Sequence, residues 1–511
     1  MKWVRNVTAA AEKVAAGLRP ASKFYGFLWE IRDELFADGF EEELMATYEP
    51  RGQEPCPPAL LAMVLLLQRY DGLSDADAVD AAENDRRWQL VLSTLGDDKA
   101  PFGQGTLVRF RLRMIANDLD KKLVERTIEI AKRSKKFGWK KLRVALDSSP
   151  FHGQGRVEDT WNLIGRAMSK VVHAISVAVG IDEEDVIKQA RLTALSGDSV
   201  KASIDIDWDD EGAQVAALQR LLEEVSMLES WIEKRAKQSA SEPPLKDALS
   251  LLHRVIDQDI EPDPSGGGKQ RLREGVAEDR VVSINDPEIR NGRKSRSQLF
   301  DGYKRHVAIS HEFILATALR PANDAEHVVT EQLFDAAAQH GKVTTIDIDR
   351  GYLASPFLVE LHQDGVVINS RPWVRPNQGK FTKYDFKIDL RRRLITCPAG
   401  NTSPILESFQ VRFAKSDCSV CELKSQCTES VARNVVLHPL EERLIQLRIS
   451  AKTSTGREVL RQRVAVEHML ARVAALQGNT ARYRGVRKNE LDLNRTAAII
   501  NLMGIARHRA A

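Results

Sequence analysis

The chain has 511 residues but lacks a long hydrophobic run, because no stretch of about 18 consecutive apolar residues occurs in it. A helix needs a run of about that length to cross a bilayer, so we expect no membrane partner. The first residues, Met1–Asn6, lead into a polar amphipathic stretch rather than the apolar core of a signal peptide. The sequence therefore predicts a cytoplasmic protein.

Other common signatures are missing as well. The 11 histidines form no group with metal-ligand spacing. The segment Gly266–Lys269 is rich in glycine, but it lacks the spacing of a phosphate-binding loop and follows no expected strand. We find no internal repeat. These absences exclude a histidine metal centre, a P-loop and a repeat architecture.

A large excess of one charge is also missing. Lys and Arg total 75 against 72 Asp and Glu, which gives a net charge of +3 and does not by itself indicate a nucleic-acid partner. The distribution is more informative, because basic residues gather in segments where phosphate contacts could lie. Each segment could equally be an ordinary solvated face. The three segments are Lys132–Arg143, which includes Lys135 and Lys136, Arg391–Arg393, and Arg482–Lys488, which includes Arg484.

Three acidic residues, far apart in the sequence, lie where metal-binding carboxylates are found in α/β proteins. Asp147 follows the apolar run Leu142–Leu146, and Asp349 follows a second apolar run at residues 343–348. Glu467 lies in a stretch with helical periodicity. Two carboxylates at the carboxyl edge of a sheet and one from a helix are suited to holding a pair of hard divalent cations for phosphoryl transfer. We predict that the three acids converge in the folded chain.

Each acid also has an ordinary explanation. Residues 148–150 are Ser-Ser-Pro, which we expect to end the strand, and an aspartate there could be a turn or N-cap residue. Asp347 competes with Asp349, because residues two apart on a strand face the same side. We prefer Asp349, which is nearer the strand end and beside Gly351, a residue that permits a sharp turn. Glu467 could instead form a helical ion pair with Arg463, worth only about 0.3–0.5 kcal/mol.

Composition and periodicity divide the chain into four parts. Residues 1–135 are helical throughout, with helices expected after Pro57, after a cap at Ser74 and from Thr106. A small bundle of this kind can place a helix in a DNA groove. Strand signals then define an α/β core over residues 136–375, interrupted from about 152 to 295 by a helical insertion. Residues 376–435 form a polar, cysteine-bearing insertion, and residues 436–511 are helices that complete the core.

The order of the strands predicts the type of sheet. We expect the elements in the order strand, hairpin, helix, strand, helix, strand. This order is typical of a mixed sheet of the ribonuclease H type, with the carboxylates on its two central strands. The predicted fold class is therefore α/β, an RNase H-like mixed sheet with an all-helical N-terminal domain and large insertions.

Short motifs along nearly the whole chain resemble those of the DDE transposases of bacterial insertion sequences. The third block of that family places Tyr, two residues, Arg, three residues, Glu, six residues and Lys. Arg463 and Glu467 fit this block, whereas Leu460 and Ala474 stand at the Tyr and Lys positions, with Arg472 nearby. The departures affect ancillary contacts to DNA and leave the metal ligand in place. The other similar segments are Pro57–Leu61, Gly72–Asp75, Thr106–Arg111, Val157–Leu163, Phe300–Lys304 and Asp349–Tyr352.

The resemblance implies a transposase that cuts and joins the DNA ends of an insertion sequence. Asp147, Asp349 and Glu467 would be catalytic and would hold two Mg²⁺ or Mn²⁺ ions, and Arg463 would contact a DNA phosphate. The partners would be double-stranded DNA, as terminal inverted repeats and target, and a second copy of the chain in a homodimer on DNA. Two other functions stay open, a domesticated DNA-binding protein that no longer cuts and an RNase H-fold nuclease without strand transfer. The DNA-binding residues would include Lys135, Lys136, Arg482 and Arg484.

Four of the five cysteines form a separate cluster. Cys418 and Cys421 make a CxxC pair, and Cys397 and Cys427 can complete a set of four ligands for a structural Zn²⁺ or an iron–sulfur cluster. A disulfide framework is not expected in a cytoplasmic protein, so the alternative is four reduced thiols. Because residues 375–435 have few large apolar side chains, we expect that they cannot bury a core of their own and that a metal supplies the missing folding energy. Cys56 is not expected to join them.

Overall fold

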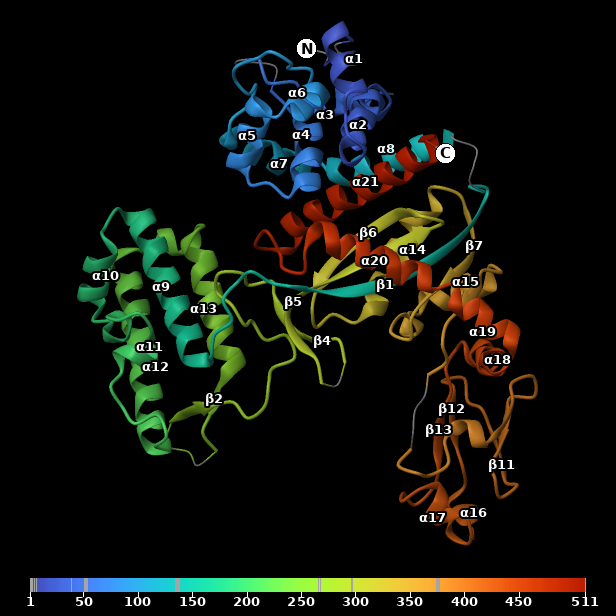
Figure 1. Ribbon diagram of the computed structural model, residues 1–511. Helices are drawn as coiled ribbons and strands as arrows, with labels where there is room; N and C mark the ends of the chain where they lie inside the picture. Colours follow the sequence, from blue (N-terminus) through green and yellow to red (C-terminus); the bar gives the residue numbers. More distant parts are fainter. Residues whose placement is uncertain are drawn as a thin grey trace.

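The computed structural model describes residues 3, 5, 7–37, 39–49, 54–133, 138–264, 266, 268–295, 297–373 and 377–510. Figure 1 shows a helical N-terminal part, a central sheet, a helical insertion on one side and a small β module below, with C-terminal helices that return to the sheet.

The described residues before the first strand of the sheet form helices. The central one, α4, begins at Pro58, a position where the missing N–H is not needed, and its apolar residues Ala59 to Leu67 are buried. Ser74 caps α5 in a capping box with Asp77, as the sequence predicts. The helices are α1 (Ala9–Ala16), α2 (Lys23–Leu35), α3 (Phe40–Ala46), α4 (Pro58–Asp71), α5 (Asp75–Asn84), α6 (Arg86–Leu92), α7 (Gln104–Ala116) and α8 (Leu119–Arg133).

A six-stranded mixed sheet lies at the centre of the described chain. Its order is β4-β5-β1-β7-β8, and β6 also pairs with β5. β1 is antiparallel to β5 and parallel to β7, and β7 is parallel to β8. The predicted mixed sheet and its hairpin are thus confirmed. β4 is an additional strand that the sequence does not predict. The elements are β1 (Lys141–His152), β4 (Arg290–Arg293), β5 (Leu299–Ser310), β6 (Phe313–Pro321), α14 (Thr330–Ala338), β7 (Lys342–Asp347), α15 (Phe357–Gln363) and β8 (Val367–Asn369).

One hydrophobic core joins the N-terminal helices, the sheet and the C-terminal helices. It includes Leu65 of α4, Val144 of β1 and Ile500 of α21. α20 packs on β1, while α21 packs on β6, α4 and α8. The N-terminal helices therefore do not form an independent bundle. The C-terminal helices are α18 (Glu441–Lys452), α19 (Ser454–Arg461), α20 (Val464–Gln477) and α21 (Val486–Ala510).

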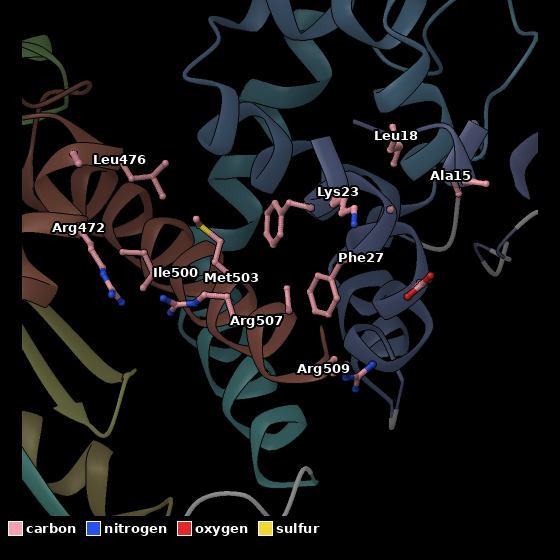
Figure 2. Close-up of a pocket in the computed structure, with 16 residues that line it drawn as sticks. Ala15, Leu18, Lys23, Phe27, Arg472, Leu476, Ile500, Met503, Arg507 and Arg509 are labelled. Carbon is pink, nitrogen blue, oxygen red and sulfur yellow. The ribbon is translucent and has the colours of Figure 1, made fainter. Parts of the chain in front are cut away.

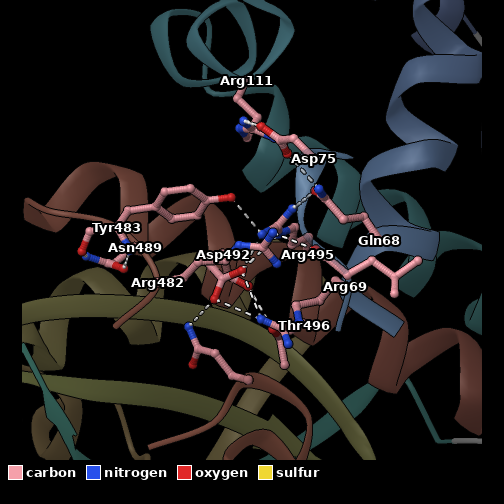
Figure 3. A network of polar contacts seen from close by, with 12 residues as sticks. Gln68, Arg69, Asp75, Arg111, Arg482, Tyr483, Asn489, Asp492, Arg495 and Thr496 are labelled. Carbon is pink, nitrogen blue, oxygen red and sulfur yellow. Dashed lines mark hydrogen bonds and ion pairs between the residues drawn. The ribbon is translucent and has the colours of Figure 1, made fainter. Parts of the chain in front are cut away.

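A buried network of charges ties α4 to α21 (Figure 3). Asp492 of α21 is fully buried and accepts hydrogen bonds from Arg495 at 2.6 Å and from Arg69 of α4 at 3.4 Å. Arg495 also donates to Gln68 at 3.0 Å, and Gln68 donates to Asp75 at 2.7 Å. Buried charges are tolerated only when they are paired. The network therefore fixes how the two helices dock.

The segment between β1 and β4 forms a helical unit with a core of its own. In α12 the residues Leu218, Leu221 and Leu228 are buried along one stripe, as their spacing predicts. Among the described residues, no single helix is long and apolar enough to cross a membrane, and α9 and α10 satisfy that test only together, across a bend of 115°. The elements are α9 (Thr160–Val179), α10 (Glu183–Ala190), α11 (Val200–Ser203), α12 (Glu211–Arg235), α13 (Leu245–Asp259), β2 (Ile260–Pro262) and β3 (Gln270–Leu272).

The cysteine-bearing segment folds as a small β module that projects away from the sheet (Figure 1). The expectation that it cannot bury a core is wrong, because Phe386, Ile395, Val411 and Phe413 are buried against one another. Each short strand contributes few apolar residues, but two small antiparallel sheets bring them together. The elements are β9 (Lys387–Asp389), β10 (Leu394–Thr396), β11 (Thr402–Pro404), β12 (Gln410–Arg412), α16 (Lys415–Ser419), α17 (Lys424–Cys427) and β13 (Asn434–Val436).

Candidate active site

Asp147 lies inside a long strand rather than at its end. β1 continues to His152, because residues 148–152 all pair with β5. The expectation that the Ser-Ser-Pro sequence ends the strand is therefore wrong. The pairing of β1 with β7 stops at Ala145, so among the described residues β1 then pairs with β5 alone until His152, which also forms an isolated bridge with Thr480. A proline is tolerated at such a position, because no second strand needs its missing N–H.

The register between β1 and β7 places two of the predicted acids near each other. Ala145 pairs with Asp347 across these parallel strands, and Asp147 and Asp349 each follow two residues later. The side chain of Asp147 is 12% exposed, whereas that of Asp349 is 44% exposed. The site thus has one buried and one solvent-facing carboxylate.

The guanidinium of Arg463 lies between these two carboxylates. Its Nη2 donates to Asp147 Oδ2 and its Nη1 to Asp349 Oδ1, both at 2.9 Å. The Nε of Arg463 is buried and has no hydrogen-bond partner in the described part of the chain. Burial raises the pKa of Asp147, and the charge of Arg463 opposes that rise. Two carboxylates that would otherwise repel each other are therefore held around one shared cation.

The third predicted acid, Glu467, does not join the cluster of Asp147, Asp349 and Arg463. It is exposed on α20, one turn after Arg463. The alternative helical ion pair with Arg463 is not what the structure has, because that arginine is paired with Asp147 and Asp349. Over the residues that the structure describes, no three His, Cys, Asp or Glu side chains are grouped so as to hold a metal ion. Residues four apart share a helix face, so Glu467 nevertheless projects from the same side of α20 as Arg463.

Asp347 has different partners from Asp349. It accepts hydrogen bonds from Arg143 Nε at 2.5 Å and Nη2 at 2.8 Å, and from Asn369 Nδ2 at 3.0 Å. Arg143 also donates to the carbonyl of Val459 at 3.3 Å. Asp347 therefore helps to anchor α19 to the sheet, while Asp349 faces the site.

No sequence pattern marks a fourth carboxylate beside these acids. Glu326, the first residue of a short 3-10 helix (Glu326–Val329) after β6, accepts a hydrogen bond from Ser148 Oγ at 2.5 Å. Its carboxylate also lies against Gly351, where an added Cβ would overlap it. Gly351 has a φ of −61°, which any residue can adopt, so the sharp turn expected of it is not the reason for glycine here. The reason is the close approach of Glu326.

Two family models match parts of the chain. One, described as Transposase domain (DUF772), matches residues 19–113, and the other, described as Transposase DDE domain, matches residues 396–506. Both matched parts of the chain are thus similar to transposases, the second to their DDE domain. No curated protein and no solved structure gave a match. The DDE match contains Arg463 and Glu467 but neither Asp147 nor Asp349, so only the geometry above links these two aspartates to the candidate site.

The basic residues predicted to bind DNA have unequal surroundings. Lys135 and Lys136 lie outside the described residues. Arg482 is partly buried and donates to the carbonyl of Leu73 at 2.5 Å, and burial lowers its pKa. Arg484, by contrast, is exposed. Of the pair predicted to bind DNA in this segment, only Arg484 faces solvent.

We expect Arg484→Glu to weaken DNA binding and to reduce the dependence of affinity on salt by about one unit of slope, as the loss of one phosphate contact does. Arg482→Glu should instead lower the melting temperature, because it places a carboxylate against the Leu73 carbonyl. Fluorescence anisotropy with a DNA duplex at several salt concentrations, together with thermal melting, measures both effects. An unchanged salt slope in Arg484→Glu would mean that this arginine is an ordinary solvated residue.

An apolar groove lies between α2 and α21 and has another basic residue at its border (Figure 2). The groove has a volume of about 930 Å³, and Phe27, Ile500 and Met503 are among the residues that line it. Arg472, which lies close to the lysine position of the family block, borders this groove too. The acids Asp147, Asp349 and Glu467 are not part of its lining. Arg472 is therefore placed at the groove rather than beside the acids.

The four clustered cysteines border one small cavity in the β module. Burial raises the pKa of Cys427, Arg433 opposes this, and the other three cysteines add to the rise. The cavity has a volume of about 30 Å³, enough for a single small guest. Cys56 lies apart, against the main core, and burial raises its pKa to about 12. The residues at the cavity include Cys397, Cys418, Cys421 and Cys427.

Proposed function

We propose that this transposase cuts and joins the ends of a mobile DNA element by metal-dependent phosphoryl transfer at a triad of Asp147, Asp349 and Glu467. The observation that carries the proposal is the pair of carboxylates at adjacent parallel strands, held around one cationic group. The mixed sheet, with these acids at its two central strands, supports an RNase H-like catalytic core.

The donor set suits Mg²⁺ or Mn²⁺. Both ions prefer carboxylate oxygens, and the space between Asp147 and Asp349 already accommodates a cation in the form of the Arg463 guanidinium. Glu467 would supply the third carboxylate, because it projects from the same face of α20 as Arg463. Two bound ions would activate the attacking water or 3′-hydroxyl and stabilise the leaving oxygen.

Other parts of the chain would bind and orient DNA. Arg463 has the planar donor fork that suits a phosphate, and exposed Arg484 would contact the DNA backbone. In this proposal residues 1–135 bind the terminal inverted repeats, residues 136–375 and 436–511 form the catalytic core, and residues 152–295 and 376–435 are insertions within it. Transposition joins two ends, so the active form would be a homodimer on DNA.

A strand-transfer assay tests this proposal. The substrate is a plasmid that carries the DNA flanking the coding sequence on both sides, incubated with the protein and Mg²⁺ or Mn²⁺, with a chelator as control. We expect cleavage at the element ends and joining to a target, both dependent on the metal. Cleavage without joining would favour a nuclease, and binding without cleavage would favour a domesticated DNA-binding protein.

We also propose that the four cysteines hold a structural metal centre, either one zinc ion or an iron–sulfur cluster. The support is the placement of four thiols at one cavity, although in this arrangement they are not yet positioned as a ligand set. An ion would draw the sulfurs to about 2.3 Å from itself. A closed set of four thiolates leaves no position for water, so the ion would take no part in cutting DNA.

Elemental analysis of the purified protein should find close to one equivalent of zinc, or iron at cluster stoichiometry. The double variant Cys418→Ser and Cys421→Ser should lose that metal, whereas Cys56→Ser should keep it. Because the β module has a core of its own, the double variant should retain its strands by circular dichroism. Metal-free protein of normal stability would leave four reduced thiols as the explanation.

A further inference from the structure

We infer that Arg463 competes with the catalytic metal ions for Asp147 and Asp349. In the metal-free protein its guanidinium neutralises the two carboxylates, and metal loading requires it to move away. The inference rests on the proposed function, because it concerns the same site, and it adds how that site is controlled.

The competition follows from the atoms that are shared. Arg463 uses Asp147 Oδ2 and Asp349 Oδ1, each at 2.9 Å. A divalent ion bridging the two carboxylates needs oxygens from the same two groups. Two cations repel each other strongly at a site of low dielectric, and the side chain of Asp147 is only 12% exposed. The guanidinium and the ion therefore cannot both occupy the space between the acids.

Arg463 is held in a way that allows exchange. It lies at the junction between α19, which ends at Arg461, and α20, which begins at Val464. Its Nε is buried without a partner among the described residues, so two ion pairs are the polar contacts that its departure breaks.

Arg143, the other arginine that connects these helices to the sheet, is bound more firmly. It holds both oxygens of Asp347 and also donates to Gln462 and to the carbonyl of Val459. We therefore expect Arg143 to stay bound to the sheet and Arg463 to exchange.

A displaced guanidinium needs a new partner, and DNA can provide one. The five N–H donors of Arg463 bind phosphate well, and Glu467 projects from the same helix face. Metal and DNA binding should then assist each other, because DNA stabilises the arginine in the position that frees the carboxylates. Such a coupling is reciprocal, so metal should raise DNA affinity by the same factor.

Calorimetric titration of Mn²⁺ into the DNA-free protein tests the inference without any measurement of activity. Arg463→Gln should bind Mn²⁺ at least about tenfold more tightly than the unaltered protein, since the ion no longer displaces a cation. Arg463→Lys keeps a charge but cannot bridge both acids as the planar fork does, so it should be intermediate. Arg472→Gln removes the same charge from α20, the helix that follows Arg463, at the groove and should leave Mn²⁺ affinity unchanged.

Two further measurements separate this inference from the proposed function. Adding Asp147→Asn to Arg463→Gln should remove the tight Mn²⁺ site, and a DNA duplex should tighten Mn²⁺ binding in the unaltered protein more than in Arg463→Gln. Equal Mn²⁺ affinity in the unaltered protein, Arg463→Gln and Arg463→Lys would overturn the competition while leaving the metal site intact. Absence of Mn²⁺ binding in all of them, or binding that survives Asp147→Asn, would overturn the metal site itself and the competition with it.

Discussion

Asp147→Asn should abolish DNA cleavage and leave DNA affinity, measured without divalent metal, close to that of the unaltered protein. We expect a loss of at least about a thousandfold in rate, because a metal ion contributes several kcal/mol to the transition state and each 1.4 kcal/mol or so is a factor of ten. Asp349→Asn and Glu467→Gln should have effects of the same order. Affinity should survive because most contacts that hold DNA go to phosphates from basic residues elsewhere. Single-turnover cleavage and an equilibrium binding assay measure the two properties separately.

Asp347→Asn is the matched control for this series. It makes the same chemical change two residues from Asp349, but at a carboxylate that pairs with Arg143 and Asn369. We expect it to lower stability and to retain metal-dependent cleavage. Loss of cleavage in Asp347→Asn, with retention in Asp349→Asn, would show that the wrong aspartate of the pair has been chosen.

Asp492→Asn should destabilise the fold more than any surface substitution. The change keeps the size of the side chain but removes the charge that Arg495 and Arg69 share in the buried network. Breaking a buried ion pair by neutralising one partner costs about 3–5 kcal/mol, because the remaining charge is left uncompensated. We expect chemical denaturation to show that the free energy of unfolding falls by an amount of that order. Asp118→Asn, whose side chain is 64% exposed, breaks a surface pair with Arg487 and should cost less than about 1 kcal/mol.

The same carboxylate predicts a dependence of stability on pH. Burial alone would raise the pKa of Asp492, but Arg495 and Arg69 lower it overall. A carboxylate with a lower pKa in the folded state stabilises the fold above its unfolded pKa of about 3.9, and this contribution is lost as pH falls through the folded pKa. The unaltered protein should therefore lose stability below about pH 4, and Asp492→Asn should show less of that loss. Equal acid profiles for the two proteins would exclude Asp492 as the cause.

The parts of the fold that could be predicted depend on residues close together in the sequence. The cap at Ser74 and the helix start at Pro58 are examples, and so are the apolar runs before Asp147 and Asp349. The continuation of β1 past Asp147 could not be predicted, because β5, the strand that supports it, lies beyond the helical insertion.

The same limit applies to the partners of the candidate site. The sequence allows two interpretations of Arg463, a contact with a DNA phosphate or a helical ion pair with Glu467. Its actual partners, Asp147 and Asp349, come from two other elements, so no local pattern indicates them. Glu326 could not be predicted for the same reason, since it reaches the site from a separate short 3-10 helix after β6. The core of the β module could not be predicted, because strands of three residues are too short to show a periodic pattern of apolar residues.

The packing of α21 also bears on the order in which a ribosome delivers this chain. α4 and α8 are synthesised early, but the surfaces that they present to α21 stay uncovered until residues 486–510 have been made. N-terminal domains commonly fold as units during translation. Here Asp492, the buried partner of Arg69, is synthesised only with α21. A nascent chain that already contains both aspartates therefore still lacks the helix that supports their sheet. In the proposed function, the catalytic site would therefore be complete only after α21 has been made.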